Sequence, residues 1–195
     1  MIEYSMMKPK DVRNLIRAGK INSFTSGMCH GYAQANLVIL PKELAFDFLL
    51  FTQRNPKPCP VLDVTEAGCP EPKVAAPGAD IRYDIPKYRI YRYGKLTDEV
   101  SDLSAYWQTD LVAFLLGCSF SFEGPMLDAG LEIRHITENH NVPMYITNIP
   151  CHKAGIFHGP MVVSMRPMKA KDAIRAVQVT SRMPSVHGAP IHIGN

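Results

Sequence analysis

An apolar run that gives way abruptly to small and hydroxylated residues is the feature that most constrains this fold. Residues 111–116 are apolar without alternation, and they lie between Asp110 and Gly117. Such a run predicts a strand buried on both faces, because a half-exposed strand alternates and a helix of this length is too short. A short helix is expected to follow and to end at Ala129, with Gly130 as its C-terminal cap.

The turn between this strand and this helix is a candidate ligand site. It contains the small or polar residues Gly117, Cys118, Ser119 and Ser121. Free backbone N–H groups and the helix dipole favour an anion at such a position, and Glu123 adds an acid or a base. Ser121 or Gly124 could instead only cap the helix, with Glu123 as a first-turn carboxylate. Neither a phosphate loop nor a nucleophile elbow is present, because the required glycine, lysine and serine spacings do not occur.

Composition restricts the classes of protein to consider. The 195 residues are 46% apolar and 20% charged, which suffices for a proper hydrophobic core. A net charge of +3 without a run of like charges argues against a nucleic-acid-binding protein. No apolar segment has the length of a membrane span, and the first residues lack the apolar core of a signal peptide. The five cysteines are widely spaced, which indicates reduced thiols in the cytoplasm and neither a zinc site nor a redox motif.

Helical and strand-like segments alternate irregularly along the chain, which predicts a mixed α/β class. Helices are expected over residues 9–18, 42–52 and 169–181, and the second is apolar nearly all round and therefore largely buried. Strands are expected over residues 33–40, 61–64, 88–93, 96–100, 131–136, 143–147 and 161–165. We expect a layered α/β unit over residues 1–195 with a mixed sheet and a second, smaller α+β subdomain, the two intertwined around residues 110–130.

Polar side chains that could do chemistry gather in loops. Besides the turn at 117–123, the candidates are Asn148, Cys151, His158, Arg166, His187 and His192. Arg166 could hold a carboxylate with two parallel hydrogen bonds, or cap a helix C-terminus. For His158 and His187, catalysis and structural hydrogen bonding are equally compatible. Structural roles are expected for His135, His140 and His152, and Cys118 ranks below the serines and Glu123 because buried thiols are usually inert.

Several longer motifs together cover nearly all of the chain. They are Gly31–Val38, Asn55–Asp63, Pro77–Arg82, Gly117–Glu123, Asn148–Cys151, Phe157–Pro167 and His187–Gly194. In these motifs the chain resembles the D-glutamate cyclase family, whose bacterial members are described as hydro-lyases. Chains of that family usually continue well past this length, so the C-terminal part usual in the family is expected to be missing here.

The resemblance implies loss of water from D-glutamate to give 5-oxo-D-proline, or dehydration of a related small carboxylate, without a metal or an organic cofactor. The α-amine attacks the side-chain carboxyl, so the site needs proton-transfer groups, donors for the developing oxyanion and a cation for the α-carboxylate. The candidate catalytic residues are Glu123, His158, Ser119 and Ser121. The candidate substrate-binding residues are Gly117, Cys118, Arg166, Asn148, Arg82 and His187.

Two other classes of function compete with an enzyme. A non-catalytic protein that binds a small carboxylate would need the turn and Arg166, but it would tolerate changes of Glu123 and His158. A purely structural or interaction protein would leave the polar turn unexplained. The expected partner is a small carboxylate or amino-acid substrate rather than nucleic acid or a membrane, and a homo-oligomer stays open.

Overall fold

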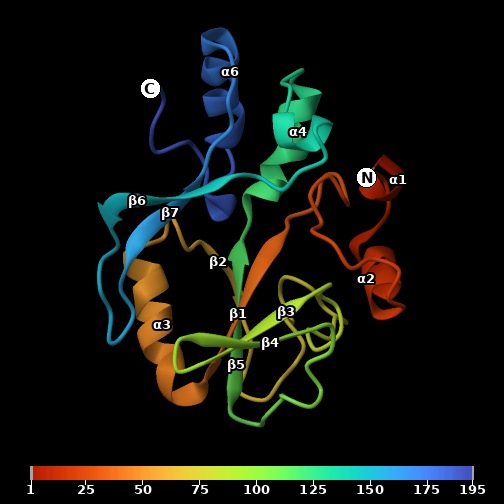
Figure 1. The fold of residues 1–195 in the computed structure, drawn as a ribbon, viewed down its shortest axis with the longest axis vertical. Helices are drawn as coiled ribbons and strands as arrows, with labels where there is room; N and C mark the ends of the chain where they lie inside the picture. The colour runs from red at the N-terminus through yellow and green to blue at the C-terminus, as the bar shows by residue number, and fades with distance from the viewer. Residues whose placement is uncertain (1, 195) are drawn as a thin grey trace.

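A three-stranded antiparallel sheet lies at the centre of the computed structural model, which describes residues 2–194 (Figure 1). The strand β5 (Leu111–Gly117) lies between β1 (Ala35–Pro41) and β2 (Val61–Val64). Residues 112–115 are all buried, so the predicted buried strand is confirmed. The central position explains the unbroken apolar run, because a strand paired on both edges and covered on both faces exposes no side chain to water.

The helix α3 (Lys42–Arg54) packs one face against this sheet. Its Phe48 ring meets Phe114 of β5 edge-to-face, with centroids 4.8 Å apart, and meets Phe157 at 5.1 Å. The prediction that this helix is largely buried is wrong, because only Phe48 and Thr52 are buried and Phe46 is 73% exposed. A helix on the outer surface of a single sheet has only one covered face, whatever its composition.

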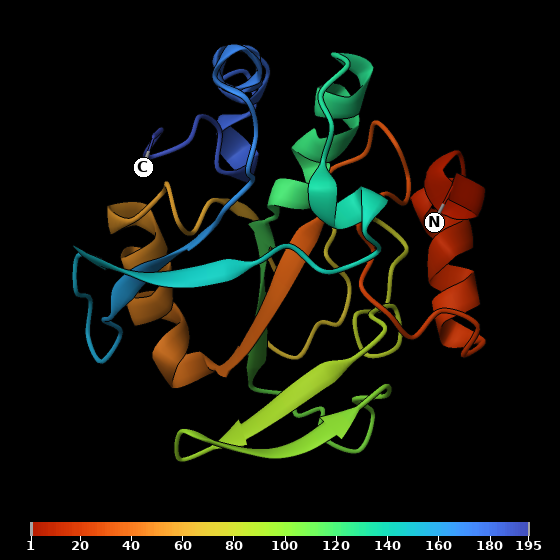
Figure 2. The ribbon, with the colours of Figure 1, turned by 45° about the horizontal axis from the view of Figure 1, so that its top comes forward.

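Two antiparallel hairpins accompany the central sheet (Figure 2). One joins β3 (Tyr88–Arg92) to β4 (Lys95–Val100), and the other joins β6 (Met144–Pro150) to β7 (Pro160–Ser164). Tyr93 and Gly94 both have positive φ in the first hairpin, as a tight two-residue turn requires. The mixed α/β class is therefore confirmed, but the expected mixed sheet is wrong, because every strand pair within residues 2–194 is antiparallel.

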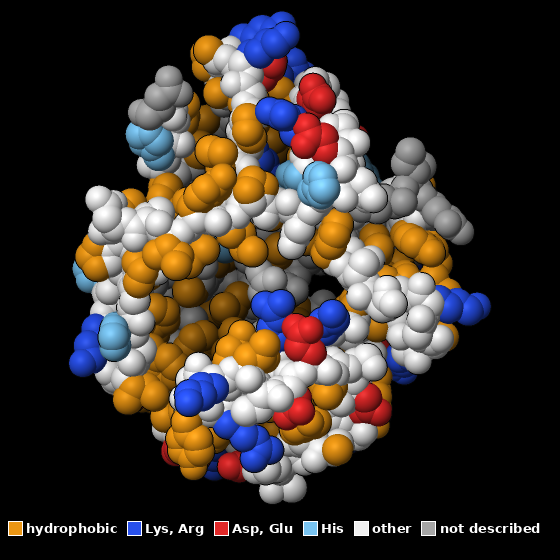
Figure 3. Space-filling view, in the orientation of Figure 1, with side chains coloured by type: hydrophobic (Ala, Val, Ile, Leu, Met, Phe, Trp, Pro, Cys, Tyr) orange, Lys and Arg blue, Asp and Glu red, His pale blue; other side chains and the backbone are white. Residues whose placement is uncertain are grey.

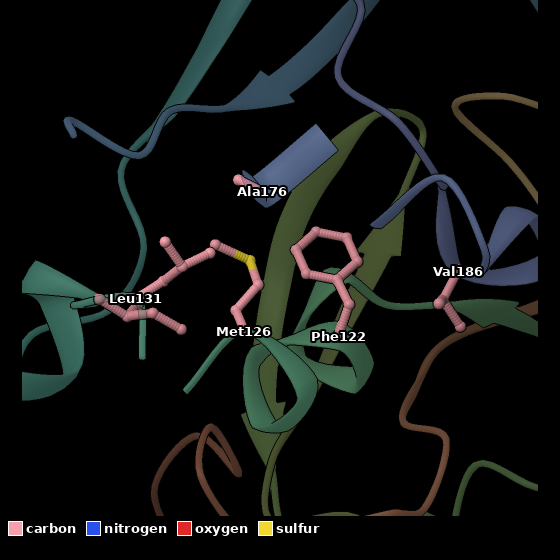
Figure 4. Packing of buried hydrophobic residues seen from close by; sticks show 6 residues of the cluster. Phe122, Met126, Leu131, Ala176 and Val186 are labelled. Carbon is pink, nitrogen blue, oxygen red and sulfur yellow. The ribbon is translucent and has the colours of Figure 1, made fainter. Parts of the chain in front are cut away.

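A second hydrophobic core lies beyond the end of β5. The remaining helices are α1 (Ile2–Ser5), α2 (Pro9–Arg17), η1 (Ser119–Phe122), α4 (Glu123–Asp128), α5 (Arg134–Thr137), α6 (Ala170–Thr180) and η2 (Pro184–Val186). Figure 4 shows Met126 of α4 between Leu131 and Phe122, with Ala176 of α6 above them. None of the helices within residues 2–194 has the length and apolar character needed to cross a bilayer.

The predicted strand at residues 131–136 is wrong. Leu131 and Ile133 are buried in this second core, but residues 131–133 do not form a strand, and α5 begins at Arg134. Burial of alternate apolar side chains gave the segment a strand-like pattern. Within the described residues no strand pairs with this segment, so the pattern reflects packing alone.

Gly117 allows the C-terminal segment to cross close to β5. A Cβ atom at this position would lie 2.0 Å from the backbone oxygen of Ser185. We expect Gly117→Ala to lower the free energy of unfolding by about 3 kcal/mol, the upper end for overpacking, because a backbone atom must move. Urea denaturation measures this change.

Gly124→Ala is the matched control for this prediction. Its Cβ would meet only the His30 side chain, at 2.8 Å, and His30 can move aside. Since alanine also favours the helix more than glycine by about 1 kcal/mol, this variant should be nearly neutral or slightly stabilised. Equal losses in both variants would contradict the role assigned to Gly117.

Candidate active site

Ser121 joins the turn after β5 to the loop that precedes β1. Its Oγ accepts a hydrogen bond from the Gln34 N–H at 2.8 Å and donates to the Gln34 carbonyl at 3.3 Å. The expectation that Ser121 or Gly124 caps the helix is wrong, because the N-cap of α4 is Phe122 and no side chain caps it. The hydroxyl of Ser121 is used instead to fix a neighbouring loop.

The backbone amides of the turn are largely occupied. Gly117 N–H donates to the Pro60 carbonyl at 2.7 Å, and Cys118 N–H donates to the Gln34 carbonyl at 2.9 Å. Ser121 N–H donates to the Cys118 carbonyl at 3.0 Å. These three donors are therefore not available to an anion, contrary to the expectation of a backbone anion site. Their acceptors are carbonyls of two other segments and of the turn itself, because buried N–H groups need partners.

Glu123 is the centre of a buried polar network. Its Oε1 accepts hydrogen bonds from Arg166 Nη2 and from His135 Nε2, each at 2.8 Å. Its Oε2 accepts from Ser26 Oγ at 2.7 Å. Glu123 is 1% exposed, so both oxygens have the partners that a buried carboxylate requires.

Arg166 carries the charge opposite to Glu123 and extends the network. Its Nη2 also donates to Ser119 Oγ at 3.1 Å, and its Nη1 donates to Ser164 Oγ at 2.9 Å. The guanidinium lies over the Phe122 ring, 5.0 Å from its centroid. Its Nε is buried without a hydrogen-bond partner in the described part of the chain, so this arginine keeps one unused donor.

A large open cleft of about 2780 Å³ runs between the sheet, the hairpins and the C-terminal segment. Figure 3 shows a hollow near the middle of this face, with hydrophobic side chains along its wall. The polar residues that line the cleft include Lys57, Cys118, Ser119, Asn148, Arg166 and His187. Glu123 is not in the lining, so Ser119 and Arg166 stand between it and the open space. The structure thus brings Ser119, Arg166 and Glu123 together in one network.

Asn148 and His187 reach the cleft from other elements. Asn148 lies exposed on β6, within the cleft lining. His187 has a left-handed backbone with φ of 80°, and its Nδ1 contacts the Lys57 carbonyl at 3.0 Å. A non-glycine residue in this conformation is held there by its surroundings, as often happens at functional sites.

Two of the candidate residues lie apart from the cleft. His158 is exposed and is not among the residues that line it. Arg82 also lies outside the lining and makes a two-bond pair with Asp80, at 2.9 and 2.6 Å. Arg82 therefore forms a local ion pair, whereas Arg166 lies in the cleft lining.

Cys118 lies half-buried between the turn and β1. Burial raises the pKa of its thiol, and the nearby Glu123 carboxylate adds to this effect. A raised pKa keeps the sulfur protonated at neutral pH, and the thiol is a weak nucleophile. The low rank given to Cys118 as a nucleophile is consistent with this environment.

Three residues of the site were missed by sequence reasoning. Ser26 and His135 both bind Glu123, although His135 was expected to be only structural and Ser26 lies in an ordinary polar loop. Lys57 lines the cleft, and its Nζ donates to the Ala189 carbonyl. Of these three residues, only Lys57 could have been singled out from the sequence, because the prolines on both sides of it fix the backbone of its loop.

Burial lowers the pKa of His187 below its ordinary value of 6.5. The Lys57 carbonyl opposes this shift, while the charges of Lys57 and Arg166 add to it. Burial also lowers the pKa of His135, although the Glu123 carboxylate opposes that shift. Both rings are therefore favoured in the neutral form in the folded protein at neutral pH.

The lowered pKa of His187 predicts a loss of stability in acid. As the pH falls through 6.5, the unfolded chain binds a proton before the folded chain does. The contribution of His187 to stability is therefore complete above its ordinary pKa and is lost as the pH falls toward the lowered, folded value. Urea denaturation at several pH values should show a smaller decline for His187→Gln than for the wild type, whereas the exposed control His158→Gln should keep the wild-type decline.

No group of three or more His, Cys, Asp or Glu side chains suited to hold a metal ion occurs in residues 2–194. The hydrogen-bonding and charged side chains of the site can bind a carboxylate, polarise a carbonyl group and exchange a proton.

Comparison with known proteins places the chain among close relatives. A sequence model described as D-glutamate cyclase matches residues 112–195. The chain is 68% identical over 189 residues to "Putative hydro-lyase YcsI" of Bacillus subtilis, covering 97% of this chain and 74% of that protein. It is 63% identical over 195 residues to a protein of the same description from Psychrobacter arcticus, covering 100% of this chain and 74% of that one. Identity at this level over nearly the whole chain means that the protein belongs to the D-glutamate cyclase family.

Proposed function

We propose that the protein is a hydro-lyase that closes D-glutamate to 5-oxo-D-proline. The α-amino nitrogen attacks the side-chain carboxyl carbon, so one C–N bond forms and one C–O bond breaks. The departing hydroxyl leaves as water after it takes up a proton. The family supports the class of reaction, and the names of the relatives support the loss of water.

The observation that carries the proposal is the placement of Arg166 at the wall of the cleft. The buried carboxylate of Glu123 accepts a hydrogen bond from the guanidinium and holds it in place. The hydroxyl of Ser119 contacts the same guanidinium nitrogen. A fixed guanidinium and a hydroxyl are suited to bind the side-chain carboxyl and to stabilise the oxyanion that develops during attack. Because the amides of Gly117, Cys118 and Ser121 are occupied, these two side chains supply the oxyanion donors.

His187 is the group in the cleft that suits proton uptake from the substrate ammonium. Its contact with the Lys57 carbonyl, an acceptor, places the ring proton on Nδ1, which leaves the lone pair on Nε2. A neutral imidazole is the form that accepts a proton. Glu123 acts in this scheme as a positioning residue for Arg166, since it is buried and outside the cleft lining.

Proton NMR of the purified protein with D-glutamate and, separately, with L-glutamate tests the proposal. We expect 5-oxoproline to form from the D form. A folded protein that converts neither form would contradict the proposed reaction. Binding of glutamate without turnover would then favour the alternative of a small-carboxylate-binding protein.

A further inference from the structure

Lys57 is a half-buried cation without an acidic partner. Its Nζ donates to the neutral carbonyl of Ala189, and no carboxylate within residues 2–194 pairs with it. Arg166 and Arg82, in contrast, each pair with a carboxylate, that of Glu123 and that of Asp80. An ammonium has three donors, so Lys57 keeps unused hydrogen-bonding capacity beside the cleft that it lines.

The surroundings hold Lys57 in place. Pro56 and Pro58 flank it and fix the backbone of its loop. Its own carbonyl contacts His187 Nδ1 at 3.0 Å, while its Nζ contacts Ala189 two residues further on. Both the backbone carbonyl and the side chain of Lys57 therefore connect the loop at 57–58 to the segment at 187–189. Both segments line the cleft.

Partial burial of an unpaired charge is unfavourable, and a ligand of opposite charge removes the penalty. Burial lowers the pKa of the Lys57 ammonium, and no carboxylate contributes to offset that shift. Arg166 supplies another positive charge in the same cleft, and its field also acts on His187. Other cations that line the cleft already pair with carboxylates, namely Arg13, Lys87, Arg89 and Arg166. The half-buried Lys57 has no such partner among residues 2–194.

We infer that Lys57 binds the second carboxylate of a dicarboxylate ligand, so that the cleft selects dicarboxylates over monocarboxylates. With the side-chain carboxyl at Arg166 and Ser119, the α-carboxylate lies at Lys57. The α-ammonium, on the same carbon atom, then lies beside His187. This inference rests on the proposed function for the identity of the amino-acid substrate, but the selection of dicarboxylates can be tested without turnover.

Glutarate is the probe, because it has two carboxylates and no amine and therefore cannot cyclise. Calorimetric titration should show that Lys57→Met weakens glutarate binding by roughly 10- to 100-fold, as expected for loss of a charge-assisted hydrogen bond. Lys57→Arg, which keeps the charge, should retain most of the affinity. Lys73→Met is the matched control, because Lys73 is 58% exposed, pairs with Glu66 and lies outside the cleft lining.

Equal affinity of Lys57→Met and the wild type for glutarate would overturn the inference, whether or not the protein converts D-glutamate. A second comparison uses only the wild type and so does not depend on the variant folding. Glutarate should bind at least about 10-fold more tightly than its monoamide, in which one carboxylate is a neutral amide. Equal affinities for these two ligands, or no binding of glutarate, would also overturn it.

Discussion

Replacing Glu123 by alanine is expected to lower the free energy of unfolding by about 3–5 kcal/mol, because it leaves the largely buried Arg166 charge without its partner. The carboxylate also satisfies Ser26 and His135, which would lose their acceptor. Chemical denaturation monitored by circular dichroism measures the change. Because Glu123 is 1% exposed, water cannot replace its carboxylate in the variant unless the surrounding residues rearrange.

Glu138→Ala is the control for this prediction. Glu138 pairs with Arg134 at 3.1 Å on the surface, where both side chains are more than half exposed. An exposed pair of this kind contributes at most about 1 kcal/mol. If Glu123→Ala lost no more stability than Glu138→Ala, the buried ion pair would not have the role assigned to it. A double-mutant cycle with Arg166→Met should in addition show a coupling energy between the two partners.

Replacing Arg166 by lysine is expected to reduce kcat for D-glutamate by about 100- to 1000-fold, the usual effect of removing one oxyanion donor. Lysine keeps the charge but lacks the planar fork that contacts Glu123, Ser119 and Ser164 together. Steady-state kinetics with NMR detection of 5-oxoproline measures the effect. Circular dichroism establishes whether the variant is folded.

Arg82→Lys provides the matched comparison for the Arg166 variant. Arg82 is the other arginine considered as a carboxylate ligand, but it pairs with Asp80 and lies outside the cleft lining. Its replacement should leave turnover within about twofold, since a partly exposed pair contributes little. The reverse outcome, with Arg82→Lys inactive and Arg166→Lys active, would transfer the carboxylate-binding role to Arg82.

The sequence by itself determined those features that follow from local pattern. The apolar run of residues 111–116 specified the central strand, and the patterns at 88–93 and 96–100 specified the strands β3 and β4. Residue type and the family resemblance marked Ser119, Glu123 and Arg166 as candidate site residues, but they did not predict that these residues contact one another. The apolar composition of residues 42–52 and the pattern at 131–136 misled, because burial of a face depends on what packs against it.

Only the tertiary structure decided which groups meet. The partners of Glu123 lie 97, 12 and 43 positions away in the chain, at Ser26, His135 and Arg166. No local pattern marks such partners, since a buried carboxylate requires donors of some kind but does not specify which segments supply them. The same holds for Lys57, whose position beside the cleft depends on contacts with residues 187–189. Local backbone preferences act over a few residues, whereas the pairing of buried charges is settled by packing between distant segments.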